Sequence, residues 1–365
     1  MSCRRGGAAA ALLVAATLAC GSTASAQDRP EASQTAPAHQ SPASEQAVVE
    51  ALMKVADVAM AGRPSPSDIP LHFRCDFLKA QEKRTYVPYI VSLDAATLAS
   101  PSVVFYLRVV ARGTAGPDGT RDAKHAGGDK PGRAKAEKMP ATFAYEDVQF
   151  VEVAPPPPGE PARISRAFAV PAGEYDVYLV LRDRATAGAP PRTSVLVAPI
   201  TVPDFWTGEL TTSSIMLADR VERLSAPLTK DQQIEHPFAL GQAEIEIAAD
   251  SSFSTRDELS VVFLIYNPTV AAGGKFDLQV DYAFYRETAE GEQYFNRTEP
   301  QRFNPSVLGP AFDPSAGQQI VAGQAVPLAA FEAGNYRLDI KVTDLISGKS
   351  LARDVTFTVT RPIGR

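Results

Sequence analysis

Short apolar runs follow one another along the chain from residue 72 onward. They are rich in Val, Phe and Tyr, are separated by stretches rich in Pro, Gly and Asp, and include 86–93, 102–112, 141–153, 259–266 and 275–285. In the last of these runs, apolar positions alternate with polar or small ones, which is the period of a strand with one buried face. Many short strands divided by turn residues predict an all-β protein made of packed sheets.

One segment ahead of the strands has a helical period instead. Residues 44–62 start at Ser44, a residue type that caps helix N-termini, and carry apolar side chains three and four positions apart. Gly62 ends the segment, so we expect one short amphipathic helix, packed either on the strands of its own chain or on a partner protein. Residues 27–43, rich in Ala, Ser, Pro and Gln, are expected to be a disordered tether.

A local pattern occurs twice, as Ala172-Gly173-Glu174-Tyr175 and as Ala333-Gly334-Asn335-Tyr336. In both copies apolar positions alternate after the tyrosine, and an aspartate follows eight residues beyond it, Asp183 and Asp344 respectively. The two copies lie about one domain apart, which predicts duplicated domains. Gly173 and Gly334 suit a tight corner, while Tyr175 and Tyr336 each start a strand, bury their rings and bond nearby backbone through their hydroxyls. The two aspartates are expected to cap backbone amides.

A glycine–tyrosine bend of this kind is the tyrosine corner of immunoglobulin-like sandwiches. On the stretches 172–205 and 333–359, the chain resembles the immunoglobulin-like modules of exported bacterial proteins, including those that accompany GWxTD and VWFA-related regions. The chain departs from antibody domains by lacking their paired cysteines and core tryptophan, and it has no Gly-Trp-x-Thr-Asp motif. The resemblance implies an exported setting and two immunoglobulin-like β-sandwich domains with one short N-terminal helix, but no activity.

The expected domain organisation follows from the repeat. The first sandwich is predicted at 66–204, with a flexible loop at 113–138, and the second at 233–361, with a junction at 205–232 between them. Phe205 and Trp206 open this junction, so we expect them at the interface between the domains. An exposed Trp206 that stacks on a ligand is the alternative.

The first 26 residues have the pattern of a secretion signal. Arg4 and Arg5 are followed by a short apolar run at 8–19 and by small residues at 24–26. The run is shorter than the roughly 20 residues of a membrane-spanning helix, so we expect cleavage and a periplasmic or extracellular location. Lipid attachment at Cys20 is an open alternative.

Charge and residue types narrow the range of functions. The formal net charge of −6 argues against a nucleic-acid partner, which requires a concentrated Lys/Arg surface. Histidines and cysteines show no metal-ligand spacing, and no nucleophile elbow or phosphate-binding loop occurs, so we predict no metal, no cofactor and no enzymatic activity. The mature chain would keep only Cys75, which we expect to behave as a buried small hydrophobe.

Aromatic and arginine side chains gather around an acidic turn at 290–292. The candidate binding residues are Tyr285, Arg286, Tyr294, Phe295, Arg297 and Phe303. Such groups could stack on a glycan or anchor a partner protein, and cross-strand pairing that stabilises a hairpin is the alternative. The sequence therefore predicts a non-catalytic module of the bacterial cell envelope that binds another envelope protein, with a carbohydrate-binding module as the second hypothesis.

Overall fold

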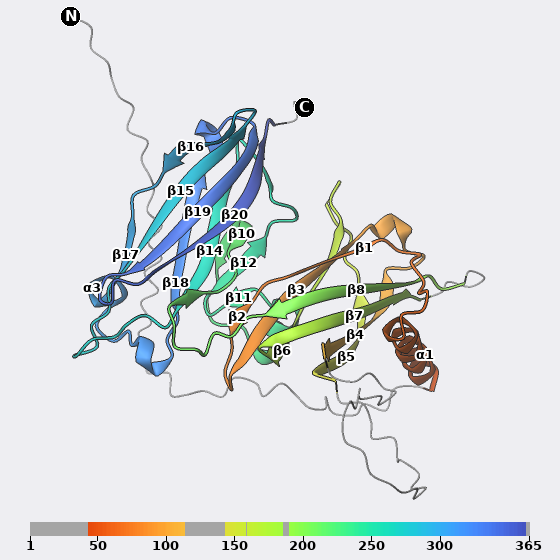
Figure 1. Cartoon of the computed structure of the whole chain (residues 1–365). Coiled ribbons are helices and arrows are strands. Elements are labelled where there is room, and N and C mark those ends of the chain that lie inside the picture. The colour runs from red at the N-terminus through yellow and green to blue at the C-terminus, as the bar shows by residue number, and fades with distance from the viewer. Residues whose placement is uncertain (1–42, 114–142, 158, 185–189, 363–365) are drawn as a thin grey trace, which may run out of the picture. The chain divides into compact units, whose positions relative to one another are not determined.

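The structure is a computed structural model that describes residues 43–113, 143–157, 159–184 and 190–362. These residues form two compact units (Figure 1). The N-terminal unit comprises 43–75 and 80–204, and the C-terminal unit comprises 76–79 and 205–362. The predicted signal, most of the tether and the loop from residue 114 to 138 lie outside the described residues.

The N-terminal unit consists of two antiparallel sheets and a helix. In the first sheet, β3 pairs with β1 and with β6, and in the second the order is β5-β4-β7-β8. Aromatic side chains of the two sheets pack against each other: the ring of Tyr89 on β3 stacks on the ring of Phe105 on β4, with centroids 6.2 Å apart. The elements are α1 (Ala43–Met60), β1 (Leu71–Cys75), β3 (Arg84–Leu93), η1 (Ala95–Thr97), β4 (Ser102–Ala111), β5 (Tyr145–Glu152), β6 (Ala162–Pro171), β7 (Gly173–Asp183) and β8 (Thr193–Val202).

The C-terminal unit also consists of two sheets, which are antiparallel except for the parallel pair of β13 and β20, and it has additional short strands. One sheet has the order β11-β12-β10-β14-β18 with β9 also on β14, and the other has the order β13-β20-β19-β15-β16 with β17 also on β15. The strands are β2 (Leu78–Lys79), β9 (Thr211–Thr212), β10 (Met216–Arg223), β11 (Ala239–Leu240), β12 (Ala243–Ile247), β13 (Ser252–Ser254), β14 (Glu258–Tyr266), β15 (Leu278–Thr288), β16 (Gly291–Arg297), β17 (Gln301–Phe303), β18 (Ile320–Pro327), β19 (Gly334–Asp344) and β20 (Ser350–Thr360). The helices are α2 (Lys230–Glu235), α3 (Pro305–Leu308), η2 (Pro314–Ala316) and η3 (Leu328–Ala330).

The core of the C-terminal unit lies between its two sheets. Inward side chains of β15 and β19 alternate with mostly polar outward ones, whereas β14 is buried on both faces from Leu259 onward. Phe263, Tyr282 and Leu338 are each at most 1% exposed. This alternation is what a sheet with one buried face requires. The chain is thus all-β with sandwich architecture, which confirms the predicted fold class.

Three local details differ from the expectations. The helix begins at Ala43, so Ser44 lies inside it and is not its N-cap. Two further short helices, α2 and α3, follow capping signals that the sequence analysis passed over: a capping box of Thr229 and Gln232, and Asn304 ahead of Pro305. The stretch 205–232, expected to be a junction, contains β9 and β10, which pair within a sheet of the C-terminal unit. Within the described residues, no helix has the length and apolarity needed to cross a bilayer.

A strained turn precedes β3 and gives a prediction. The Arg84 N–H donates to the Gln81 carbonyl oxygen at 3.0 Å, and the two central residues, Glu82 and Lys83, both have φ of 55°. This left-handed conformation disfavours residues that carry a Cβ. Lys83→Gly is therefore expected to stabilise the N-terminal unit by about 0.5–1 kcal/mol, measured as an increase in its urea midpoint. Lys54→Gly, at an exposed position inside α1, should instead destabilise this unit by about 1 kcal/mol. A lower urea midpoint in both variants would contradict backbone strain at Lys83.

Candidate functional site

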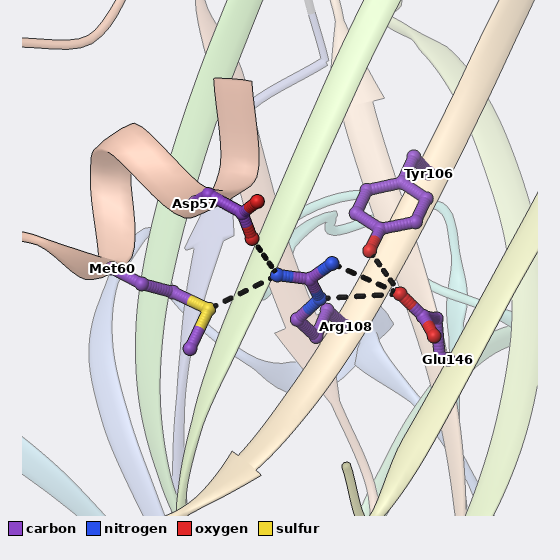
Figure 2. Close-up of polar contacts among 5 residues, drawn as sticks. All are labelled: Asp57, Met60, Tyr106, Arg108 and Glu146. Atoms are coloured by element: carbon purple, nitrogen blue, oxygen red, sulfur yellow. Dashed lines mark hydrogen bonds and ion pairs between the residues drawn. The ribbon is translucent and has the colours of Figure 1, made fainter. Parts of the chain in front are cut away.

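The N-terminal unit buries a charged group, the guanidinium of Arg108 on β4. Its side chain is 2% exposed, on the sheet face opposite the inter-sheet core, beneath the end of α1 (Figure 2). The reason is local, since β4 is buried on both faces: Phe105 and Leu107 point to the other sheet, while Tyr106 and Arg108 point to the helix side. A charge this deeply buried requires partners.

Arg108 finds its partners on two different elements. Nη1 lies 2.5 Å from Asp57 Oδ1 and 3.2 Å from Met60 Sδ, both on α1. Nη2 and Nε lie 3.0 Å and 3.3 Å from Glu146 Oε1 on β5, and the Tyr106 hydroxyl donates to the same oxygen (Figure 2). These contacts join α1, β4 and β5 around one side chain.

The surroundings of Arg108 and Tyr106 raise the pKa of both side chains, which keeps both protonated. Burial lowers the pKa of Arg108, but the hydrogen bonds to Asp57 and Glu146 and the negative charge of Glu146 outweigh burial, so the pKa is raised above its ordinary value. Burial first, and then the hydrogen bond to Glu146, raise the pKa of Tyr106, which remains a donor. The Phe143 ring covers the guanidinium at 4.0 Å. With its nitrogens directed at these groups and its surface covered, Arg108 is placed to fasten the helix to the sheet.

Apolar contacts hold the rest of α1 on the same sheet. Leu52 and Ala56 are fully buried against Val104, Tyr106 and Val180. The helix therefore packs on its own chain, which was one of the two interpretations left open. This packing explains why Val180, on the outward face of β7, is apolar.

The two glycine–tyrosine bends have the same geometry. The Tyr175 hydroxyl donates to the Pro171 carbonyl oxygen, and the Tyr336 hydroxyl donates to the Glu332 carbonyl oxygen, each at 2.9 Å. The preceding glycines have φ of +154° and +156°, which favours residues without a Cβ. At Gly334 a Cβ would lie 3.3 Å from Arg286 Nε. Each corner thus ties the start of its strand to the backbone four residues earlier.

Removing these hydroxyls should weaken each unit separately. Tyr175→Phe and Tyr336→Phe are each expected to destabilise their own unit by about 1 kcal/mol, because a partly buried carbonyl loses its donor. Urea unfolding followed by fluorescence of Trp206, the single tryptophan, reports on the C-terminal unit, and hydrogen exchange reports on the N-terminal unit. Tyr294→Phe, at an exposed tyrosine, is the control with no expected change. An unchanged C-terminal midpoint in Tyr336→Phe would contradict the role of the corner.

The aspartates that follow the corners accept backbone hydrogen bonds. Asp344, 1% exposed, accepts from the N–H groups of Thr269, Ile346 and Ser347 at 2.7, 2.9 and 3.1 Å. Burial would raise the pKa of Asp344, but these donors outweigh it and hold the pKa below its ordinary value.

Asp183 has the same role in the N-terminal unit. Its side chain is 2% exposed and accepts from the N–H groups of Ala99 and Arg192 at 2.8 and 2.7 Å. In both units the aspartate thus links the end of the corner strand to the loop between an earlier pair of strands.

The predicted ligand-binding residues do not all lie on one surface of the sandwich. Phe303 is 8% exposed and belongs to the core, and the Phe295 ring packs on Phe331 and Tyr336 at 4.8 and 5.3 Å. Arg286 is ion-paired with Glu332 beside the corner. These three residues support the fold rather than a common binding surface.

Two members of the set do meet on the outer sheet face. The rings of Tyr285 and Tyr294 lie 5.9 Å apart at 80°, and Tyr294 is 58% exposed. Arg337, which the sequence analysis did not single out, lies 4.7 Å from the Tyr285 ring and makes two 2.7 Å contacts with Glu292. Hydrogen bonds from Arg337 hold the pKa of Glu292 below its ordinary value. Arg297 is exposed at the end of β16.

Phe205 and Trp206 have partners within the C-terminal unit. The Phe205 ring is 2% exposed and lies 5.1 Å from the Tyr266 ring. Trp206 is 41% exposed, with Lys79 Nζ 4.3 Å from its ring. Their expected place between the domains stays a prediction.

The described residues define a protein of two immunoglobulin-like sandwiches, the first with a helix fastened to its sheet. No protein-family model matches the chain, and no curated protein matches it. Among solved structures it is similar to Escherichia coli alpha-2-macroglobulin activated by porcine elastase, with 12% identity and a TM-score of 0.23 over 82% of this chain and 23% of that chain. A Salmonella alpha-2-macroglobulin mutant has 14% identity and a TM-score of 0.20, over 81% of this chain and 17% of that chain. Overlaps this weak carry no argument about function, and the resemblance to modules that accompany GWxTD and VWFA-related regions stays a prediction.

Proposed function

We propose that this protein is a non-catalytic, exported module of the bacterial cell envelope that binds or holds another envelope protein. The supporting observation is the role of three buried ionisable groups whose pKa values are shifted. Arg108, Tyr106 and Asp344 are 2%, 0% and 1% exposed, and their polar atoms bind other parts of the fold. Perturbed groups that serve catalysis have to reach a substrate, whereas these join helix, strands and loops.

The test is reciprocal capture. The tagged chain, expressed with its own export signal, is cross-linked in envelope preparations, and each captured candidate is then tagged and used to recover the chain. We expect one partner recovered in both directions and displaced by purified untagged chain. Asp344→Ala, which should destabilise the C-terminal unit, controls for capture through unfolded chain. Failure of reciprocal recovery, or turnover of ester, peptide or glycoside substrates by the purified chain, would overturn the proposal.

A second candidate function is glycan binding on the outer face of β15 and β16. Tyr294 is favoured because it is 58% exposed beside Tyr285, Arg337 and Glu292, so an aromatic face lies next to hydrogen-bonding groups. On a glycan array, Tyr294→Ala should lower binding at least about tenfold. Phe150→Ala removes a 41% exposed ring from the other unit and should have no effect. No bound glycan, or equal loss in both variants, would exclude this function.

A further inference from the structure

Strand β18 forms one edge of its sheet and leaves backbone groups unpaired on its open side. It pairs with β14 in regular register over eight residues, without a bulge. The Gly323 carbonyl oxygen accepts from Gln301 Nε2 at 2.6 Å, which shows that the backbone of Gly323 points away from β14. Strand periodicity directs the backbone of Val321 and Ala325 the same way. Within the described chain, no group accepts from the N–H of these three residues.

The other long edge strands carry features that oppose the addition of a further strand. On β8, the Val195 N–H donates to the Pro66 carbonyl oxygen and therefore points away from β7. Pro199, four residues later, has its backbone on the same open side, where it offers no N–H to a further strand. On β20, Arg353 pairs with the buried Ile340 and thus places a charge on the core side of the edge. Strand β16 has an irregular register, β5 is acidic, and β6 holds a buried arginine.

Strand β18 has none of these protective features over most of its length. Its residues are all uncharged, and the single proline, Pro327, is its last residue. On its outward face lie Val321, which is 40% exposed, followed by Gly323 and Ala325. An uncharged, regular edge with small side chains is the kind that accepts another strand.

We propose that two copies of this chain associate by antiparallel pairing of β18 with β18 of the second copy, around a two-fold axis at Gly323. In this register Val321 lies opposite Ala325 of the partner subunit, and Gly323 lies opposite its own counterpart. The same three residues supply donors and acceptors on both sides, which is what an isologous contact requires. No charge faces a like charge, and the Gly323 oxygen retains a second lone pair beside Gln301. The contact is small, so the dimer is weak, and it does not depend on the proposed envelope partner.

In this register, position 321 of each copy faces position 325 of the other copy, so the dimer contains two such pairs. Charged side chains at both positions therefore test the pairing directly. Sedimentation equilibrium of the purified exported chain from about 10 µM to about 1 mM should show reversible dimers. Val321→Lys with Ala325→Lys places lysine against lysine and should weaken the dimer at least about tenfold relative to Val321→Lys with Ala325→Glu, which places lysine against glutamate. Both double variants change the same two outward positions, and matched melting temperatures would show that they fold alike.

A third variant tests whether this edge is specific. Val197→Lys lies on β8, where Val197 is 47% exposed, and it should leave the dimer unchanged. A chain that stays monomeric up to about 1 mM would overturn the proposal. So would equal affinities of the two charge variants, or an equal loss in Val197→Lys.

Discussion

Replacing Asp344 with alanine is expected to destabilise the C-terminal unit by about 3–5 kcal/mol, because three N–H groups lose an ionised acceptor in a buried site. The acceptor is 1% exposed and serves Thr269, Ile346 and Ser347. The measurement is urea unfolding followed by the fluorescence of Trp206. Asp354→Ala, at an exposed aspartate on the neighbouring β20, should change the free energy of unfolding by less than about 0.5 kcal/mol. Similar losses in the two variants would contradict the role of Asp344.

The same residue predicts a pH dependence of defined sign. Its folded-state pKa is held below the ordinary value, so the unfolded chain takes up this proton more readily. The stabilisation from Asp344 is therefore complete above the ordinary aspartate pKa of about 3.9 and is lost as pH falls through the lowered folded-state pKa. In Asp344→Asn this part of the acid dependence should disappear, so the difference in stability from the unsubstituted chain should shrink as pH falls below about 4. A difference that grows toward acid would contradict the assignment.

The second large effect is expected at Arg108. Arg108→Ala should destabilise the N-terminal unit by about 3–5 kcal/mol, since it opens a cavity and removes the donors that satisfy Glu146 beside the Tyr106 hydroxyl. Hydrogen exchange of α1 and β4, together with the urea midpoint of this unit, measures the change. The amides of α1 should lose protection first, because Arg108 joins the helix to the sheet through Asp57.

Two companion variants separate charge from packing. Arg108→Met keeps most of the volume, and Glu146, 36% exposed, can turn to water, so about half of the loss or less is expected. Asp57→Ala removes a 59% exposed partner and should cost about 1 kcal/mol or less. If Asp57→Ala were as damaging as Arg108→Ala, the helix contact rather than the buried guanidinium would dominate.

Much of the fold could be predicted because its signals are local. The glycine–tyrosine bends, the alternation after Tyr336 and the aspartate eight residues later all lie within one continuous stretch, and the strand period alone assigns their faces. The helical period of residues 44–62 is local in the same way, and it predicted the helix α1 that packs on Val180.

The Arg108 cluster could not be predicted, because Asp57, Arg108 and Glu146 come from three elements far apart in the sequence. Their meeting depends on where the helix lies across the sheet, and no local pattern encodes that placement. The same holds for Arg337 beside Tyr285, which depends on the pairing register of β15 with β19.

The predicted ligand set grouped aromatic residues by proximity in sequence, and the structure places them on different faces of the sheet. Strand alternation sends Tyr294 and Phe295 to opposite faces, so one is exposed while the other joins the core. Proximity along a strand therefore indicates a shared surface only for every second residue.

Hydrogen-exchange mass spectrometry of the full chain carrying Asp344→Ala is the most direct test that each sandwich has its own core. The amides of β14, β15, β19 and β20 should lose protection, while those of β3, β4 and β7 keep theirs. Equal loss of protection in β4 and β7 would show a single shared core and contradict the two-sandwich architecture.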